Sequence, residues 1–250
     1  MRKNVLITGA SSGLGAGMAR ILAEKGHNLA LTARRVDRLE ALKAEIEAAH
    51  PDVEVVVLAL DVNDHDQVFA VFKQAIRELG GLDRVIVNAG LGKGARIGTG
   101  KFYANKETAE TNFVAAIAQC EAAMEHFYER QAGHLVVISS VSAMRGLPSA
   151  VTTYAATKAA VAHLAEGIRA DLAKRKGHDI KVTTLFPGYI ASEMNEGVKT
   201  KLMVDTETGC KAMVKAIERE VTESAIPPWP WSPLSQFMKH APLSVLRRLT

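Results

Sequence analysis

Short apolar runs alternate with longer amphipathic stretches through most of this chain, and that alternation constrains its fold more than any other feature. The pattern is typical of repeated βα units, in which helices cover both faces of a parallel sheet. It predicts six strands, at Val5–Thr8, Leu29–Ala33, Val53–Leu60, Arg84–Asn88, Leu135–Ser139 and Lys181–Phe186. Apolar residues at helical spacing predict helices at Val36–Ala49, Val68–Leu79, Glu107–Arg130 and Thr153–Lys176. We therefore expect an α/β fold with a doubly wound parallel sheet, three layers (α/β/α) and a single domain.

Charge and composition remove several classes of protein from consideration. The net charge of +4 is spread along the chain, without the dense basic stripe of a nucleic-acid groove, so we expect no nucleic-acid partner. No run approaches the roughly 18 apolar residues of a spanning helix, and the apolar run after Met1-Arg2-Lys3 is too short for a secretory signal. Cys120 and Cys210 lie far apart, with no CxxC pair and no histidine at ligand spacing. We expect no disulfide framework, no metal site and a reducing, cytoplasmic location.

The first predicted strand runs directly into a glycine-rich turn, and a helical pattern follows. The turn holds Gly9, Gly13 and Gly15 in the spacing GxxxGxG, with Ser11, Ser12 and Leu14 between them. This order of strand, turn and helix opens a Rossmann fold, where backbone N–H groups and the helix dipole bind a dinucleotide pyrophosphate. The spacing differs from the usual GxGxxG fingerprint, and a simple strand-to-helix connector remains the alternative.

The second predicted strand ends in Ala33 and is followed by Arg34 and Arg35. An acidic residue at such a position accepts hydrogen bonds from the adenosine ribose of NAD, whereas arginine accommodates the 2′-phosphate of NADP. The two arginines therefore favour NADP(H). The alternative is that they form salt bridges with acids on the surface.

Tyr154 and Lys158 lie four residues apart in a helical segment and so share one face of the helix. A unit charge about 4 Å from the phenol is worth at most ~4 kcal/mol, enough to lower the phenol pKa by up to ~3 units. We therefore expect Lys158 to make Tyr154 a usable proton donor and acceptor. The YxxxK pattern is a weak signal alone, but Ser140 directly follows the predicted strand Leu135–Ser139, and Asn88-Ala89-Gly90 lies at the end of the strand that begins at Arg84. Ligands of open parallel sheets bind at these carboxyl ends.

Together these residues resemble the classical short-chain dehydrogenase/reductase family, over roughly residues 4–192. The resemblance implies a catalytic tetrad of Asn112, Ser140, Tyr154 and Lys158, in which Asn112 holds a water that relays protons. It also implies further contacts with the cofactor, which come from Asp61 and Val62 at the adenine, from Asn88, Ala89 and Gly90, and from Pro187, Gly188, Ile190 and Ser192 beside the nicotinamide.

The catalytic serine is ambiguous in this sequence. Family members commonly place it thirteen residues before the tyrosine, whereas Ser140 precedes Tyr154 by fourteen. Ser140 aligns best, and Ser139 and Ser142 remain alternatives.

The chain departs from the family pattern near its end. Many members end with a short strand and a glycine-rich tail, but residues 227–233 read Pro-Pro-Trp-Pro-Trp-Ser-Pro, and we expect no helix or central strand to pass through them. We expect residues 1–226 to form the NADP-binding and catalytic domain. Residues 227–250 would then be a Pro/Trp-rich tail that covers the cleft or mediates contacts. Apolar and basic residues follow the prolines, at Phe237-Met238, Leu243, Val245-Leu246 and Arg247-Arg248-Leu249. Similar tails occur in relatives that handle lipid-like or steroid-like substrates, so the resemblance implies a hydrophobic substrate. A dimer contact and a peripheral membrane contact are the alternatives.

These features predict an NADP(H)-dependent oxidoreductase that interconverts a carbonyl and a secondary alcohol by hydride transfer, with Tyr154 as general acid and base. The expected substrate is hydrophobic, such as a lipid-, steroid- or acyl-like molecule, and family habit suggests a homodimer or homotetramer. Two alternatives remain. One is a scaffold that senses NADP without catalysis, and the other is an NAD-linked alcohol dehydrogenase.

Overall fold

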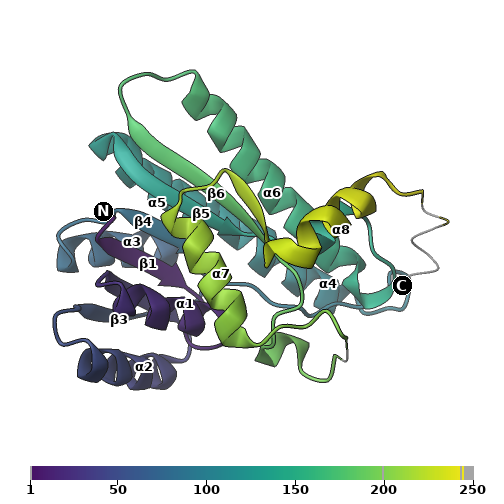
Figure 1. The fold of residues 1–250 in the computed structure, drawn as a ribbon, viewed down its shortest axis with the longest axis horizontal. Helices are drawn as coiled ribbons and strands as arrows, with labels where there is room; N and C mark the ends of the chain where they lie inside the picture. Colours follow the sequence, from purple (N-terminus) through teal and green to yellow (C-terminus); the bar gives the residue numbers. More distant parts are fainter. Residues whose placement is uncertain (1, 199, 243, 245–250) are drawn as a thin grey trace.

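A computed structural model describes residues 2–198, 200–242 and 244 of the chain (Figure 1). In these residues a seven-stranded sheet has the order β3-β2-β1-β4-β5-β6-β7, and each pair of neighbouring strands is parallel. The strands are β1 (Asn4–Thr8), β2 (Asn28–Ala33), β3 (Val55–Ala59), β4 (Arg84–Val87), β5 (Ala132–Ile138), β6 (Asp179–Pro187) and β7 (Glu223–Ile226). The α-helices are α1 (Gly13–Glu24), α2 (Val36–Ala49), α3 (His65–Glu78), α4 (Phe102–Ala109), α5 (Ala115–Arg130), α6 (Thr152–Ala173), α7 (Thr206–Glu218) and α8 (Pro228–His240).

Helices cover both faces of the sheet, so the strands are buried on both sides (Figure 1). One core joins the sheet to α1, α2 and α7, and the other joins it to α3, α5 and α6. This arrangement confirms the expected doubly wound, three-layer α/β/α fold in a single domain. The strand order reverses between β1 and β4, and the ends of these strands form the crevice where such sheets bind ligands.

All six predicted strands are present, with bounds that differ by up to three residues, but the sequence analysis missed β7. This strand has only four residues, Glu223 to Ile226, and lies at the edge of the sheet. Pairing with β6 defines this segment as a strand. The sequence does not predict it, because its two apolar residues form too short a pattern. The expectation that this chain lacks the short final strand of the family was therefore wrong.

The single helix predicted over Glu107–Arg130 is three successive elements. α4 ends at Ala109, the π-helical turn η1 (Glu110–Val114) follows, and α5 begins at Ala115. A π-helical turn widens the helix by one residue, and such turns occur frequently at functional sites. Here the wide turn carries Asn112, whose side chain is buried.

The prediction that no helix passes through the prolines was also wrong, because α8 includes Pro228, Pro230 and Pro233. Trp229 is non-helical (φ −103°, ψ 131°), so the regular turns begin after it. Pro230 then begins the regular turns, where backbone N–H groups have no intrahelical partner to lose, and Pro233 lies inside the helix. The predicted apolar and basic residues at 243 and 245–249 lie outside the described residues.

None of the described helices combines the length and the apolarity that crossing a membrane requires.

Candidate active site

In the glycine turn after β1, backbone segments pack directly against one another, with no room for a side chain between them. Gly9 and Gly13 have φ of +65° and +53°, a region that favours glycine. A Cβ on Gly15 would lie 2.3 Å from the Gly9 carbonyl oxygen, and one on Gly9 would lie 2.9 Å from the Cα of Ala89. Close packing therefore requires glycine at positions 9 and 15, and the positive φ favours glycine at position 13.

The N-terminus of α1 has the properties of an anion-binding site. The helix begins at Gly13, its first turn (Gly13-Leu14-Gly15-Ala16) holds no acidic residue, and the Ser12 side chain makes no capping hydrogen bond within the described chain. The first N–H groups of a helix lack intrahelical partners, and the helix dipole is positive at this end. A diphosphate matches both properties.

Arg35 joins the end of β2 to the glycine turn. Its guanidinium donates to the hydroxyl oxygens of Ser11 (3.2 Å) and Ser12 (2.7 Å) and to Glu193 (3.1 Å). Glu193 also accepts from Arg38 at 2.6 Å, and these two arginines lower the pKa of its carboxyl group. Arg34 is mostly exposed, with its Nη1 4.0 Å from the Asp61 carboxylate. Arg35 is thus the arginine that lies against the turn.

The end of β4 supports the same turn. The Asn88 side chain donates to the carbonyl oxygens of Thr8 (2.9 Å) and Gly9 (3.3 Å). The Thr8 hydroxyl accepts from the backbone N–H groups of Asn88 (3.0 Å) and Ala89 (3.1 Å). Asn88 and Ala89 therefore hold the entry to the turn in place.

Asn112 connects the loop after β4 to α6. Its amide accepts from the Leu91 N–H (2.8 Å) and donates to the Leu91 carbonyl (2.9 Å), and it also reaches the Thr157 hydroxyl at 3.4 Å. A Cβ on Gly90 would lie 3.1 Å from Asn112 Oδ1 and 3.5 Å from Lys158 Nζ. Asn112 and Lys158 are therefore close neighbours across Gly90.

Tyr154 and Lys158 both project from the first two turns of α6. Lys158 Nζ lies 5.8 Å from the centre of the Tyr154 ring and donates to the Ile138 carbonyl at 2.9 Å. Burial lowers the pKa of Lys158 from 10.5 to about 8. The YxxxK spacing thus places the ammonium beside the phenol ring, at the carboxyl end of β5.

The expected decrease in the pKa of Tyr154 was wrong for the protein alone. Burial raises this pKa, because it disfavours the phenolate, and a contact with the Ser140 hydroxyl opposes the rise without cancelling it. The ammonium of Lys158 lies over the ring and donates to a backbone carbonyl, a geometry that differs from the close charge pair that we assumed.

The three candidate serines have different partners. Ser139 donates to the Lys158 carbonyl at 2.7 Å, so its hydroxyl serves the packing of α6 on β5. Ser142, in the turn η2 (Val141–Met144), has a buried hydroxyl without a hydrogen-bond partner among the described residues. The Ser140 hydroxyl accepts from the Ser142 N–H (3.1 Å), donates to the Pro187 carbonyl (3.4 Å) and contacts Tyr154. Ser140 is the serine that faces the phenol.

The segment after β6 closes the site from the other side. Ile190 is buried and bridges to Val204, and Ser192 begins the short helix η4 (Glu193–Asn195). A Cβ on Gly13 would lie 3.4 Å from the Cβ of Ser192, so this segment approaches the glycine turn. In the loop after β4, a Cβ on Gly92 would lie 2.9 Å from Met194. The loops after β4 and β6 therefore meet.

At the end of β3, Asp61 is partly exposed and Val62 is buried. The structure brings all the predicted residues to the carboxyl ends of the strands, with Arg34 directed to solvent beside Asp61. Sequence reasoning missed Thr8, Thr157, Glu193 and Arg38. The sequence could have predicted Arg38, because this residue lies one helical turn after Arg35 and so shares its face of the helix.

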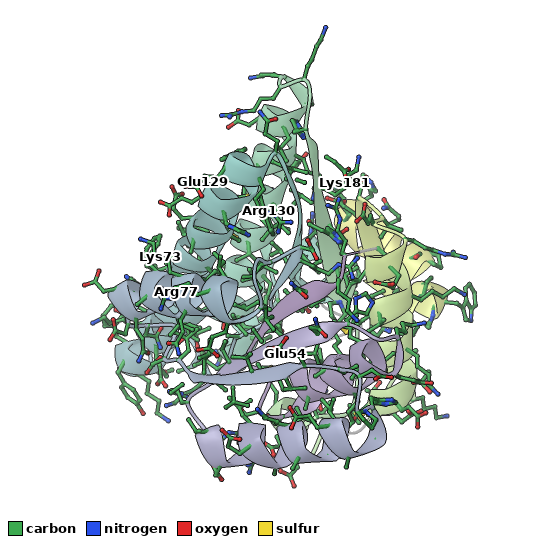
Figure 2. All side chains as sticks on the ribbon, turned by 90° about the vertical axis from the view of Figure 1, so that its left-hand side faces the viewer. Glu54, Lys73, Arg77, Glu129, Arg130 and Lys181 are labelled. Carbon is green, nitrogen blue, oxygen red and sulfur yellow. The ribbon has the colours of Figure 1, made fainter. Side chains whose placement is uncertain are left out.

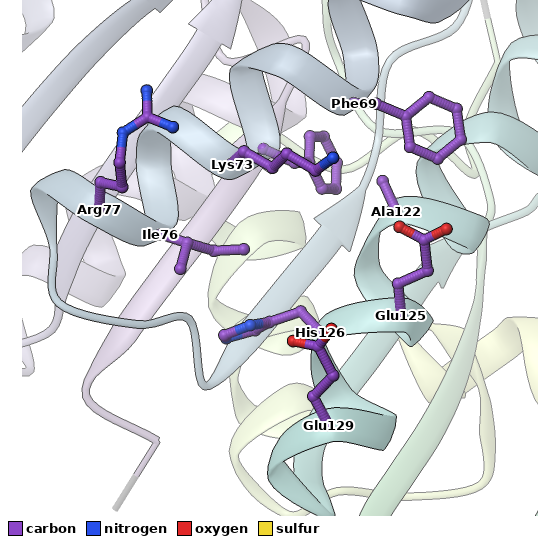
Figure 3. A pocket seen from close by; sticks show the side chains of 9 residues that line it. Phe69, Lys73, Ile76, Arg77, Ala122, Glu125, His126 and Glu129 are labelled. Atoms are coloured by element: carbon purple, nitrogen blue, oxygen red, sulfur yellow. The ribbon is translucent and has the colours of Figure 1, made fainter.

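A surface hollow of about 290 Å³ lies elsewhere, between α3 and α5 (Figure 3). Lys73 and Arg77 come from α3, while Glu125, His126 and Glu129 come from α5. Figure 2 shows charged side chains of these two helices on the side of the molecule away from α8. None of the predicted site residues lines this hollow.

Comparisons with known proteins agree with this geometry. The profile of the family described as short chain dehydrogenase matches residues 3–203. The chain is 55% identical over 248 residues to an uncharacterized oxidoreductase of Mycobacterium tuberculosis (strain H37Rv), a match that covers 99% of this chain and 97% of the relative. It is 34% identical over 197 residues to the farnesol dehydrogenase of Aedes aegypti, covering 77% of this chain and 79% of that one.

Solved structures share the fold. An alcohol dehydrogenase of the archaeon Thermococcus sibiricus, complexed with 5-hydroxy-NADP, has a TM-score of 0.79 at 28% identity, covering 89% of this chain and 95% of that one. A short chain dehydrogenase/reductase of Burkholderia phymatum, in complex with NAD, has a TM-score of 0.84 at 20% identity, covering 99% and 95%. The second likeness concerns the fold alone.

Proposed function

This chain belongs to the short-chain dehydrogenase family, and from that premise we propose that it is an NADP(H)-dependent oxidoreductase that interconverts a carbonyl and a secondary alcohol. One observation carries the proposal. The Ser140 hydroxyl contacts the Tyr154 phenol, and the Lys158 ammonium lies 5.8 Å from the centre of the same ring. A hydrogen-bond donor, a proton donor and a cation thus converge at the carboxyl end of β5.

The residues present fit a dinucleotide. Gly9, Gly13 and Gly15 let the backbone approach closely, and the first N–H groups of α1, which have no intrahelical partner, suit a diphosphate. Asp61 and Val62 would lie at the adenine, and Pro187, Gly188, Ile190 and Ser192 at the nicotinamide. When bound, NADPH supplies the hydride for the carbonyl carbon.

Arg35 supports the preference for NADP(H) over NAD(H). Its guanidinium already donates to two hydroxyl groups of the glycine turn, so it is positioned where the adenosine end of a dinucleotide would lie. A guanidinium can hold a 2′-phosphate by two hydrogen bonds. The likeness to a structure complexed with an NADP derivative, at 28% identity, points the same way.

In the reducing direction, the chain's own groups manage the proton and the developing charge. Tyr154 gives its phenolic proton to the carbonyl oxygen. The Ser140 hydroxyl would turn its one proton from the Pro187 carbonyl to the substrate and donate a hydrogen bond that stabilises the oxyanion. Lys158 keeps a cation beside the phenol as it loses its proton and would bind a ribose hydroxyl of the cofactor. We propose that Asn112 positions Lys158 and the loop after β4, in addition to holding the relay water.

The raised pKa of Tyr154 favours reduction at neutral pH. Burial keeps the phenol protonated, which is the form that a proton donor needs, while alcohol oxidation needs the phenolate. Oxidation should therefore be fastest at alkaline pH.

Apolar side chains support a hydrophobic substrate. Ile97, Phe102 and Tyr103 follow β4, and Met194 follows β6; all four are exposed at the carboxyl end of the sheet, where the substrate would enter. The 34% identity to a farnesol dehydrogenase, whose name gives an apolar alcohol, agrees with this class. We also propose a cytoplasmic setting, which suits two buried free cysteines, and a homodimer or homotetramer. A tail contact with membranes and the absence of nucleic-acid partners stay predictions.

The test compares NADPH with NADH at equal concentration in a spectrophotometric screen of 3-oxoacyl thioesters, steroid ketones and aldehydes. We expect turnover with at least one class and a preference for NADPH. A clear preference for NADH would refute the NADP assignment and favour the NAD-linked alternative. Tight NADPH binding without turnover on any class would refute the enzymatic role and favour a sensing scaffold.

A further inference from the structure

The two tryptophans of the chain lie two residues apart and have opposite environments. Trp229 is 78% exposed, whereas Trp231 is 3% exposed. Trp231 packs with Val141, Phe186 and Ala225 in a small cluster separate from the two main cores. Helix α8, which carries Trp231, contacts β7 and η2 at the carboxyl end of the sheet (Figure 1). The buried tryptophan therefore joins the C-terminal helix to the neighbourhood of Ser140.

The Trp231 indole lies directly on the backbone of Gly188. A Cβ on Gly188 would be only 2.1 Å from two atoms of the indole, so no other residue fits here without moving the ring. Gly188 is held on its other side by a hydrogen bond from its N–H to the Ile226 carbonyl at 2.8 Å. The preceding residue, Pro187, accepts the hydrogen bond of the Ser140 hydroxyl. Trp231 thus sets the backbone that orients Ser140.

Tyr189 continues this arrangement toward solvent. Its ring centre lies 5.8 Å from that of Trp231 at an interplanar angle of 58°, a favourable tilted pair. Its backbone carbonyl accepts from the Val204 N–H at 3.0 Å, and the next residue, Ile190, is buried. Yet the Tyr189 side chain is 42% exposed. The ring is therefore partly packed against Trp231 and partly open to solvent.

We propose that Tyr189 is a specificity-determining residue, whose ring packs against the apolar part of the substrate, and that Trp231 is a positioning residue that holds Pro187, Gly188 and Tyr189. This inference rests on the proposed function and deepens it. The ligand chemistry is a carbonyl or alcohol with an alkyl chain or ring beyond the reacting carbon. The indole N–H of Trp231 has no hydrogen-bond partner among the described residues, so its contribution is packing, and phenylalanine should replace it.

Substrates that differ only in chain length provide the kinetic test. With NADPH, 2-butanone and 2-decanone present the same reacting group to the enzyme. Tyr189→Ala should raise the KM for 2-decanone about tenfold, because it removes the apolar surface of one aromatic ring, and should leave the KM for 2-butanone within about twofold. The KM for NADPH should not change.

Variants of Trp231 test the positioning role. Trp231→Ala should lower kcat for both ketones about tenfold, since Ser140 loses its fixed partner, and Trp231→Phe should restore most of that loss. Trp229→Ala is the matched control, because it removes an exposed tryptophan from the same helix and should retain the wild-type kcat and KM. If Trp231→Ala behaves like Trp229→Ala, or if Tyr189→Ala affects both ketones equally, the inference is wrong.

Fluorescence gives a readout that does not depend on turnover. A Trp229→Phe protein retains Trp231 as its single tryptophan, and 2-decanone should change the emission of Trp231 while 2-butanone should change it much less. A protein that shows this difference but never oxidises NADPH would refute the proposed function and leave the binding surface supported. A protein that reduces both ketones without dependence on Tyr189 or Trp231 would refute this inference alone.

Discussion

Replacing Lys158 by methionine should stabilise the fold at neutral pH while it removes a group that we place in the active site. The side chain is 6% exposed, and its ammonium donates to the Ile138 carbonyl. Burial lowers the pKa of Lys158 from 10.5 to about 8. A charged lysine is therefore held where the fold disfavours its charge.

The size and sign of the effect follow from that shift. At 1.36 kcal/mol per pKa unit, the penalty on the charged form is about 3 kcal/mol at pH 7. The unfolded state binds more protons than the native state between pH 8 and 10.5, so the free energy of unfolding of the wild type should rise across this window. The lost hydrogen bond to Ile138 offsets about 1 kcal/mol. Lys158→Met should thus be about 2 kcal/mol more stable at pH 7 and about 1 kcal/mol less stable near pH 10.5.

Urea unfolding of both proteins at pH 7, 8, 9 and 10, followed by tryptophan fluorescence, measures the difference. Lys73→Met, at an exposed position on α3, is the control and should show no comparable dependence on pH. A Lys158→Met protein that is less stable than the wild type at pH 7, or a difference that stays constant to pH 10, would refute the reasoning. Turnover of the variant should be lost despite the gain in stability, as expected where function requires a strained site.

Three further outcomes are expected. Arg35→Ala should raise the KM for NADPH at least tenfold and change the KM for NADH little, because charge-assisted hydrogen bonds are worth about 1.5–3 kcal/mol; initial rates with both cofactors measure this. Ser140→Ala should lower kcat about 100-fold, whereas Ser139→Ala should chiefly cost about 1 kcal/mol of stability; a Ser140→Ala enzyme with near-normal turnover would mean that another hydroxyl acts. Arg84→Met should lower the free energy of unfolding by about 2 kcal/mol in urea, since the buried His134 and the partly exposed Glu218 each lose a charge-assisted hydrogen bond, and an unchanged midpoint would contradict this.

The fold was predictable because the strands of a doubly wound sheet are buried on both faces. β1, β2 and β4 are almost continuous apolar runs, and turns or helices with clear periodicity separate them. β7 and α8 escaped prediction because tertiary contacts define them. β7 exists through its pairing with β6, and in α8 Pro228 and Pro230 lie before or at the start of the regular turns, where a proline costs no intrahelical hydrogen bond.

The relative positions of the candidate residues were also readable from the sequence, but their environments were not. Spacing alone places Tyr154 and Lys158 on one helical face, and the structure brings Ser140 to the same place. The sequence does not reveal how deeply a side chain is buried. Burial raises the pKa of Tyr154 and lowers that of Lys158, so the net shift of the phenol pKa is opposite in direction to the one assumed. The contact of Trp231 with Gly188 joins distant segments and has no local signal.

Hydride transfer with Tyr154 as proton donor is the central claim, and an isotope experiment tests it most directly. NADPH with deuterium at C4 of the nicotinamide, on one face or the other, is incubated with 2-decanone and either the wild type or Tyr154→Phe. We predict that one labelled form places deuterium on the carbinol carbon, and that Tyr154→Phe forms this product at least ~100-fold more slowly while still binding NADPH. Product without deuterium from either form, or an undiminished rate in Tyr154→Phe, would contradict the account.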